Sequence, residues 1–152
     1  MSSLIKKQFE LTRGYFIKNA ESLSDQVMDV QPEGFNNTIH WQIGHVLVSA
    51  ESLLLGFPQS GSLPANYGEL FGTRTKPSDW QGEVPTVETL IEQLKEQLTR
   101  LKEIPDARFE ETLPEPFLGM SSVGEIANFV AFHESLHLGQ IQTMKRVVEA
   151  SL

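Results

Sequence analysis

The segment that decides the fold is residues 122–149, SVGEIANFVAFHESLHLGQIQTMKRVVE. It opens on Ser122, with Glu125 three residues later, which is the capping box that starts a helix. Apolar residues then recur at three- and four-residue steps, a spacing that places them on one face of a helix. The apolar members of this stripe are Ile126, Val130, Ile141, Met144 and Val148. The pattern predicts a long helix that turns this face into a protein core.

Two histidines lie in the middle of the apolar stripe. His133 and His137 are four residues apart, so their side chains share one helix face, one turn apart. Burying two neighbouring imidazoles in a core costs free energy of folding unless each polar nitrogen has a hydrogen-bond or metal partner. A metal ion supplies one partner to both rings, and this spacing is suited to gripping one ion.

Three other segments have helical periodicity. They span about residues 3–27, 38–56 and 86–104, and Gly- and Pro-containing stretches separate them. Long connections follow the second and third helices, at 58–85 and 105–120, and 65–71 is a candidate short helix in the first of these. No segment has the alternation of a strand. Residues 1–152 therefore predict one all-α domain, a four-helix bundle.

The second predicted helix carries a third inward-facing imidazole. Trp41, His45 and Val48 recur on one face, beside largely apolar neighbours. Sites in helical bundles are built from side chains on facing helices, so His45 completes a three-histidine site if the second and last helices are neighbours. His40 lies five residues before His45, which is poor spacing for a shared ion; a role in lining the pocket stays open.

The run His133-Glu134-Ser135-Leu136-His137 also matches the H-E-x-x-H signature of zinc proteases. Such proteases need a further ligand along the chain, and the one carboxylate available, Glu149, lies ~18 Å from His137 along a helix. We therefore set the protease aside. Glu134 itself is offset by about 100° from His133. We expect a solvent-facing or supporting carboxylate, with a general-base role left open.

Composition narrows the class of protein. The chain has no cysteine, which excludes disulfides, thiolate ligands and a cysteine nucleophile. The net charge is -8 without a block of Lys or Arg, which argues against nucleic acid and anionic membranes as partners. No targeting segment and no apolar run of about 20 residues is present. We expect a soluble cytoplasmic protein.

Two motifs in this order resemble the DinB-like (YfiT-like) superfamily. Residues 37–45, NTIHWQIGH, resemble its second-helix motif, a capped start, an aromatic and then Gly-His. His133-Glu134-x-x-His137-x-Gly139-Gln140 resembles its last-helix motif. Gln31-Pro32-Glu33-Gly34 resembles the turn that precedes its second helix, and the resemblance covers the whole chain. His40 is a departure, because a small or apolar residue is common there.

The resemblance implies an up-down-down-up four-helix bundle that is often a homodimer. It also implies a divalent metal, zinc or nickel, held by one histidine on the second helix and two on the last. In this sequence these are His45, His133 and His137. Members with assigned activity include S-transferases that use bacillithiol or mycothiol, and others are presumed metal-dependent hydrolases.

Three functional hypotheses follow. The first is a metal-dependent thiol S-transferase that joins a low-molecular-weight thiol to a small electrophile, since metal binding favours the nucleophilic thiolate. The second is a hydrolase using metal-bound water, for which Glu134 is the local candidate base. The third is a non-catalytic metal-binding or dimerisation module, in which the histidines only stabilise the bundle.

Overall fold

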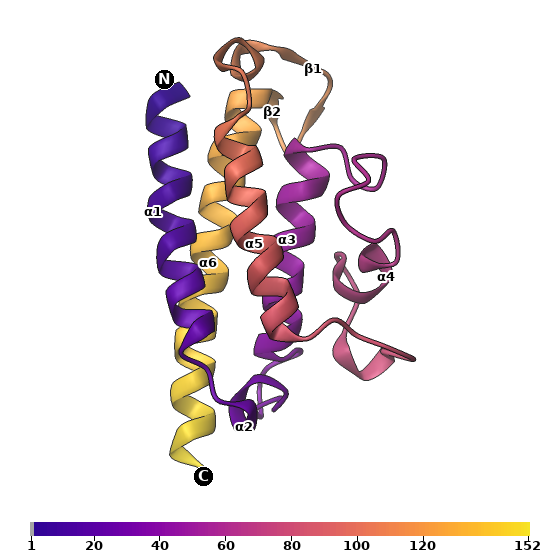
Figure 1. The fold of residues 1–152 in the computed structure, drawn as a ribbon, viewed down its shortest axis with the longest axis vertical. Helices are drawn as coiled ribbons and strands as arrows, with labels where there is room; N and C mark the ends of the chain where they lie inside the picture. Colours follow the sequence, from indigo (N-terminus) through magenta and orange to yellow (C-terminus); the bar gives the residue numbers. More distant parts are fainter. Residues whose placement is uncertain (1) are drawn as a thin grey trace.

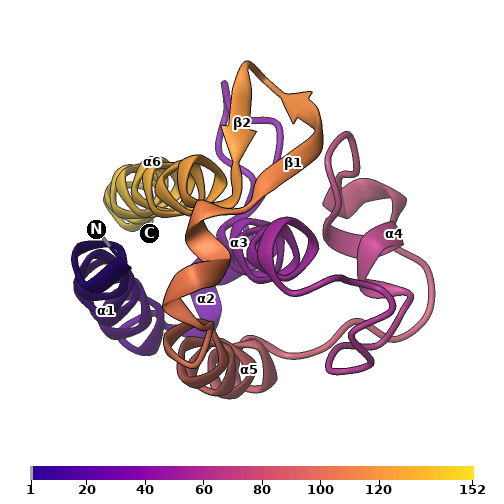
Figure 2. The same cartoon turned by 90° about the horizontal axis from the view of Figure 1, so that it is seen from above.

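Four long helices form the body of the protein, whose computed structural model describes residues 2–152. They are α1 (Ser2–Glu21), α3 (Ile39–Leu54), α5 (Val87–Lys102) and α6 (Val123–Ala150). Helix α1 packs against α5 and α6, and α3 packs against the same two helices. Seen from above, the four helices occupy the corners of a quadrilateral with α1 opposite α3 (Figure 2). The predicted all-α bundle is confirmed.

The helix directions explain the longer of the two predicted connections. Helices α1 and α6 run one way along the bundle, whereas α3 and α5 run the other way (Figure 1). This is the up-down-down-up order. Because α3 and α5 are parallel, the chain between them must return along the whole length of the bundle. This return holds α4 (Tyr67–Phe71), inside the predicted 65–71, and the 3-10 turn η1 (Pro77–Asp79), on the outer side of α3.

The caps of α3 and α6 lie where the sequence predicts the helices to begin. The Thr38 side chain accepts from the backbone N–H of Trp41 at the start of α3. At the start of α6, Ser122 and Glu125 form the reciprocal capping box. These caps fix where each helix begins, and so fix the turn on which each histidine lies.

The first predicted helix is wrong beyond residue 21. Helix α1 ends at Glu21, and a separate short helix α2 (Asp25–Met28) follows. The Ser22 hydroxyl donates to the Asn19 carbonyl, and Ser24 takes an extended conformation as the cap of α2. The serines therefore end the first helix, although Leu23 and Val27 continue its apolar period and still reach the core.

The predicted absence of strands is also wrong. After the 3-10 turn η2 (Asp106–Glu110), β1 (Thr112–Phe117) and β2 (Met120–Ser122) form a two-stranded antiparallel hairpin. Leu118 and Gly119 make its turn, both with positive φ, as a two-residue hairpin turn requires. Most hairpin residues are exposed, so no apolar alternation marked these strands. The hairpin sits beside the ends of α3 and α6 (Figure 2).

A layer of polar side chains crosses the interior of the bundle. Arg13 on α1 is fully buried, and its Nε donates to Glu134 Oε1 on α6 at 2.5 Å. Arg13 also donates to Gln97 of α5, whose amide donates to Glu51 of α3. Arg100 pairs with both oxygens of Glu51. Two apolar clusters lie on either side of this layer, and it ties all four helices together.

No helix among residues 2–152 is long and apolar enough to cross a membrane.

We expect Arg13→Met to lower the free energy of unfolding by about 3–5 kcal/mol, because it leaves the Glu134 carboxylate buried without its partner. Urea denaturation followed by circular dichroism measures this change. Lys102→Met is the control, since the Lys102–Glu10 pair lies at the surface and should contribute less than about 1 kcal/mol. The double variant Arg13→Met/Glu134→Met should regain part of the loss, and equal losses in R13M and K102M would contradict this account.

Candidate metal centre

Three imidazoles from two helices converge between α3 and α6. The Nε2 atom of His133 lies 3.2 Å from Nε2 of His45 and 3.2 Å from Nε2 of His137. The three ligand atoms all lie within 4.8 Å of one another. His45 is buried, and the other two rings are half-buried. The three residues that the sequence singled out are therefore brought together, and they could hold one metal ion.

The tautomer of His45 is fixed by the backbone of the long connection. Its Nδ1 lies 2.7 Å from the carbonyl oxygen of Phe71, at the end of α4. A carbonyl oxygen only accepts, so His45 Nδ1 carries the proton and Nε2 keeps a free lone pair. Trp41 stacks on the same ring, with centroids 4.6 Å apart and planes 11° apart. Together these contacts aim the His45 lone pair at the other two histidines.

His137 is held in the same tautomer by a glutamine. Its Nδ1 lies 2.8 Å from Gln42 Oε1. The Gln42 amide nitrogen is directed at Asn37 Oδ1, 3.0 Å away, which assigns Oε1 as the acceptor for His137. His137 Nδ1 is therefore protonated, and its Nε2 lone pair also points to the centre. Such partners orient metal-binding histidines and set their basicity.

His133 completes the triad with an aromatic neighbour. Its ring stacks on Phe129, with centroids 6.0 Å and planes 27° apart. With two lone pairs already aimed at its Nε2, only the proton of His133 can relieve their repulsion while the centre holds no ion. A cation accepts all three lone pairs at once, so the arrangement fits a metal ion better than it fits three uncharged imidazoles.

Burial keeps the three histidines neutral. Desolvation, followed by repulsion from His133 and His45, lowers the pKa of His137 to about 3. Desolvation and the charge of His45 lower the pKa of His133 to about 4. Burial also lowers the pKa of His45, against an opposing contribution from its hydrogen bond to Phe71. At neutral pH the rings are thus in the form that binds metals.

Glu134 is neither solvent-facing nor beside the ring nitrogens. It is 2% exposed, which corrects the expectation of a solvent-facing carboxylate. Its Oε1 and Oε2 accept from the Arg13 guanidinium at 2.5 and 3.5 Å. The glutamate of the H-E-x-x-H run is therefore part of the polar layer toward α1.

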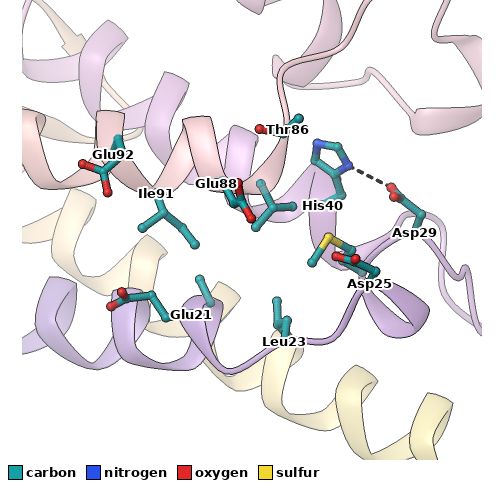
Figure 3. A pocket seen from close by; sticks show the side chains of 12 residues that line it. Glu21, Leu23, Asp25, Asp29, His40, Thr86, Glu88, Ile91 and Glu92 are labelled. Carbon is teal, nitrogen blue, oxygen red and sulfur yellow. Dashed lines mark hydrogen bonds and ion pairs between the residues drawn. The ribbon is translucent and has the colours of Figure 1, made fainter.

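His40 belongs to a different part of the molecule. It lines a cavity of about 690 Å³ near the start of α3, among the carboxylates of Glu21, Asp25 and Glu88 (Figure 3). Its Nδ1 and Nε2 each lie 2.8 Å from an acceptor, Asp29 Oδ1 and the Pro85 carbonyl. His40 thus joins the two connections that flank α3, and it is not among the converging imidazoles.

The glycine before His45 has a steric role that the sequence did not disclose. A Cβ atom at Gly44 would lie 2.2–2.4 Å from three atoms of the Phe71 ring, far inside van der Waals contact. Phe71 is fully buried, and its carbonyl is the group that holds His45 Nδ1. Gly44 therefore lets α4 approach α3 closely enough to support a metal ligand.

The architecture and the histidine site define a class, helical-bundle proteins with a candidate metal centre between two helices. Residues 8–141 match the model of the DinB superfamily. The chain belongs to this superfamily, as its motifs predicted. A search of curated proteins finds no match.

We expect Gly44→Ala to lower the free energy of unfolding by about 1–3 kcal/mol, because the added methyl group displaces the Phe71 ring. Gly139→Ala is the matched control. Gly139 is also helical, but nothing lies within 4 Å of a Cβ placed there, so the change should stabilise by about 0.5–1 kcal/mol through helix propensity. Urea denaturation of both variants measures the contrast, and a neutral Gly44→Ala would contradict the steric role.

The lowered histidine pKa values predict how stability depends on pH in the metal-free protein. Between pH 6.5, the ordinary histidine pKa, and about pH 4, His133 and His137 are protonated in the unfolded chain. In the folded protein these two histidines stay neutral over this range. Stability should therefore fall as pH falls through this window, and these groups should add nothing above about pH 7. In His133→Gln/His137→Gln, unfolding free energies in chelator between pH 4 and 7 should change less with pH. Parallel curves for the two proteins would contradict the prediction.

Proposed function

We propose that this DinB-superfamily protein is a divalent-metal-dependent S-transferase that joins a low-molecular-weight thiol to a small electrophile. The observation that supports the proposal most strongly is the convergence of three Nε2 atoms, two of them with tautomers fixed by Phe71 and Gln42. Three protein ligands are typical of a catalytic metal site with an open position, whereas closed structural sites use four.

His45, His133 and His137 would hold the ion, and imidazole ligands suit zinc and nickel. When bound, the metal would lower the pKa of a thiol at the open position and so favour thiolate. The chain has no cysteine, so no internal thiol competes for that position. Trp41 and Phe129 stack on two of the three rings, those of His45 and His133, and cover one face of each.

The transfer step needs no oxidant or reductant beyond the thiol and the electrophile. The thiol gives up its proton to solvent, and the sulfur lone pair forms a bond to the electrophilic carbon. The leaving group departs with the electrons of the bond that breaks. Where the electrophile is an activated double bond instead, its π electrons shift to the far carbon, which then takes a proton from solvent. The chain's contribution is to fix the ligand geometry and to shield the site from water, as Phe71, Gln42 and Trp41 do for the histidines.

The hydrolytic alternative has weaker support, because it needs a general base near the ion. Glu134, the carboxylate that the H-E-x-x-H run offers, is engaged toward α1, where both its oxygens accept from buried Arg13. Glu134→Gln should therefore lower stability while the protein still binds metal. Complete loss of a hydrolytic activity, with metal content and folding kept, would instead favour hydrolysis.

We expect protein purified without an affinity tag to contain close to one equivalent of zinc or nickel by elemental analysis. The triple variant His45→Ala/His133→Ala/His137→Ala should contain essentially none, because all three ligands are gone. His40→Ala is the control, since His40 lies outside the triad, and it should keep wild-type metal content. Equal metal in the triple variant and the wild type would overturn the assigned centre.

The activity is tested by incubating metal-loaded protein with bacillithiol and model electrophiles and measuring the thioether product. We expect turnover that the triple histidine variant loses by at least about 100-fold, the scale of losing a metal that activates the nucleophile. Bound metal without a conjugate under any metal loading would contradict the S-transferase. It would leave the hydrolase and the non-catalytic module. A large fall in melting temperature on chelation, with no pocket at the centre wide enough for a substrate, would favour the module.

A further inference from the structure

The triad is closed on one side and bordered by different groups on the other. Toward the start of α3, Trp41 covers the His45 ring and Gln42 is bonded to His137. Helix α6 runs antiparallel to α3, so the next turn toward the hairpin brings in Ser49 of α3 and Phe129 of α6 (Figure 1). Of these two sides, the second is the one where a hydroxyl, that of Ser49, lies next to a ligand nitrogen.

Ser49 places a hydroxyl beside the ligand nitrogens. It lies four residues after His45, on the same face of α3, and is half-buried. Its Oγ is 3.5 Å from His45 Nε2, the atom that faces the centre of the triad. This distance is at the limit for a hydrogen bond, so the hydroxyl is not strongly committed to the ring.

Two other helical hydroxyls, those of Ser135 and Thr143, are used differently. Ser135 and Thr143 each donate to the carbonyl oxygen four residues earlier, at 2.9 Å. The Ser49 hydroxyl is instead directed at the side chain of the residue four positions earlier. The Ser49 hydroxyl therefore faces the Nε2 atoms of the three histidines instead of a backbone carbonyl.

We propose that Ser49 borders the open coordination position and donates a hydrogen bond to the thiol sulfur, or other small anion, that occupies it. This inference rests on the metal-dependent function proposed above. A hydroxyl donor next to an anionic sulfur favours thiolate over thiol, because it stabilises the charged form. Phe129, across from Ser49 on α6, offers no hydrogen-bonding group, so Ser49 on α3 is the donor for this ligand.

The geometric test replaces Ser49 by cysteine. The wild-type chain has no cysteine, so any sulfur ligand from the protein must be the one introduced. Cobalt(II) is the probe, added without exogenous thiol. We expect cobalt-loaded Ser49→Cys to show a thiolate-to-cobalt charge-transfer band in the near ultraviolet. Ser52→Cys is the matched control on an exposed position of the same helix, and it should show none.

The functional test is Ser49→Ala, titrated as the cobalt protein with 2-mercaptoethanol and followed by the same band. We expect full cobalt occupancy with thiol affinity weakened by about 3- to 10-fold, the effect of losing one hydrogen bond. Failure of the wild type to bind cobalt would overturn this inference together with the proposed function. Cobalt binding with no band in Ser49→Cys and unchanged thiol affinity in Ser49→Ala would overturn the role of Ser49 alone.

Discussion

The buried Arg13 guanidinium is the constraint on which the candidate centre depends. A charge removed from water needs an opposite charge and complete hydrogen bonding, and Arg13 receives both from Glu134, Gln97 and the Leu94 carbonyl. Since Glu134 must face α1, the rotation of α6 about its axis is fixed. His133, about 100° away on that helix, then faces α3. One ion pair thus determines the direction in which both α6 histidines point.

The centre also depends on a segment outside the bundle. The parallel course of α3 and α5 forces the chain to return along the bundle, and this return carries the Phe71 carbonyl that holds His45. Thr75, on the same return, accepts from the Trp41 indole that covers His45. The long connection is therefore part of the site, although none of its side chains is among the three converging ligands.

The sequence predicted the bundle and the three imidazoles because both follow from the helical periodicity of the apolar residues. A histidine inside an apolar stripe must point where the stripe points. The supporting groups could not be predicted in this way. Phe71 acts through its backbone carbonyl, which no side-chain pattern reveals, and Gln42 is an ordinary polar residue until the position of His137 is known. The sequence left Glu134 as a solvent-facing or supporting carboxylate, because it does not show that Arg13, 121 positions earlier, lies opposite it.

Errors in the predicted elements have physical causes too. Leu23 and Val27 continue the apolar periodicity of the first helix. Periodicity alone therefore could not show that the helix ends at Glu21, before Ser22 and Ser24. The hairpin has mostly exposed residues and two prolines, Pro114 and Pro116, so neither alternation nor composition marked it as β structure. The homodimer and the cytoplasmic location are not decided by this fold and stay predictions.

The diagonal placement of helices has a consequence for biosynthesis. Helices α1 and α3 both find their main partners in α5 and α6, which are synthesised after them. The nascent N-terminal half therefore has no extensive helix pair of its own to bury its apolar stripes. We therefore expect the bundle to form only once α5 and α6 have been synthesised. Two fragments cut within the return segment should need each other to fold, since each would carry one diagonal of the bundle.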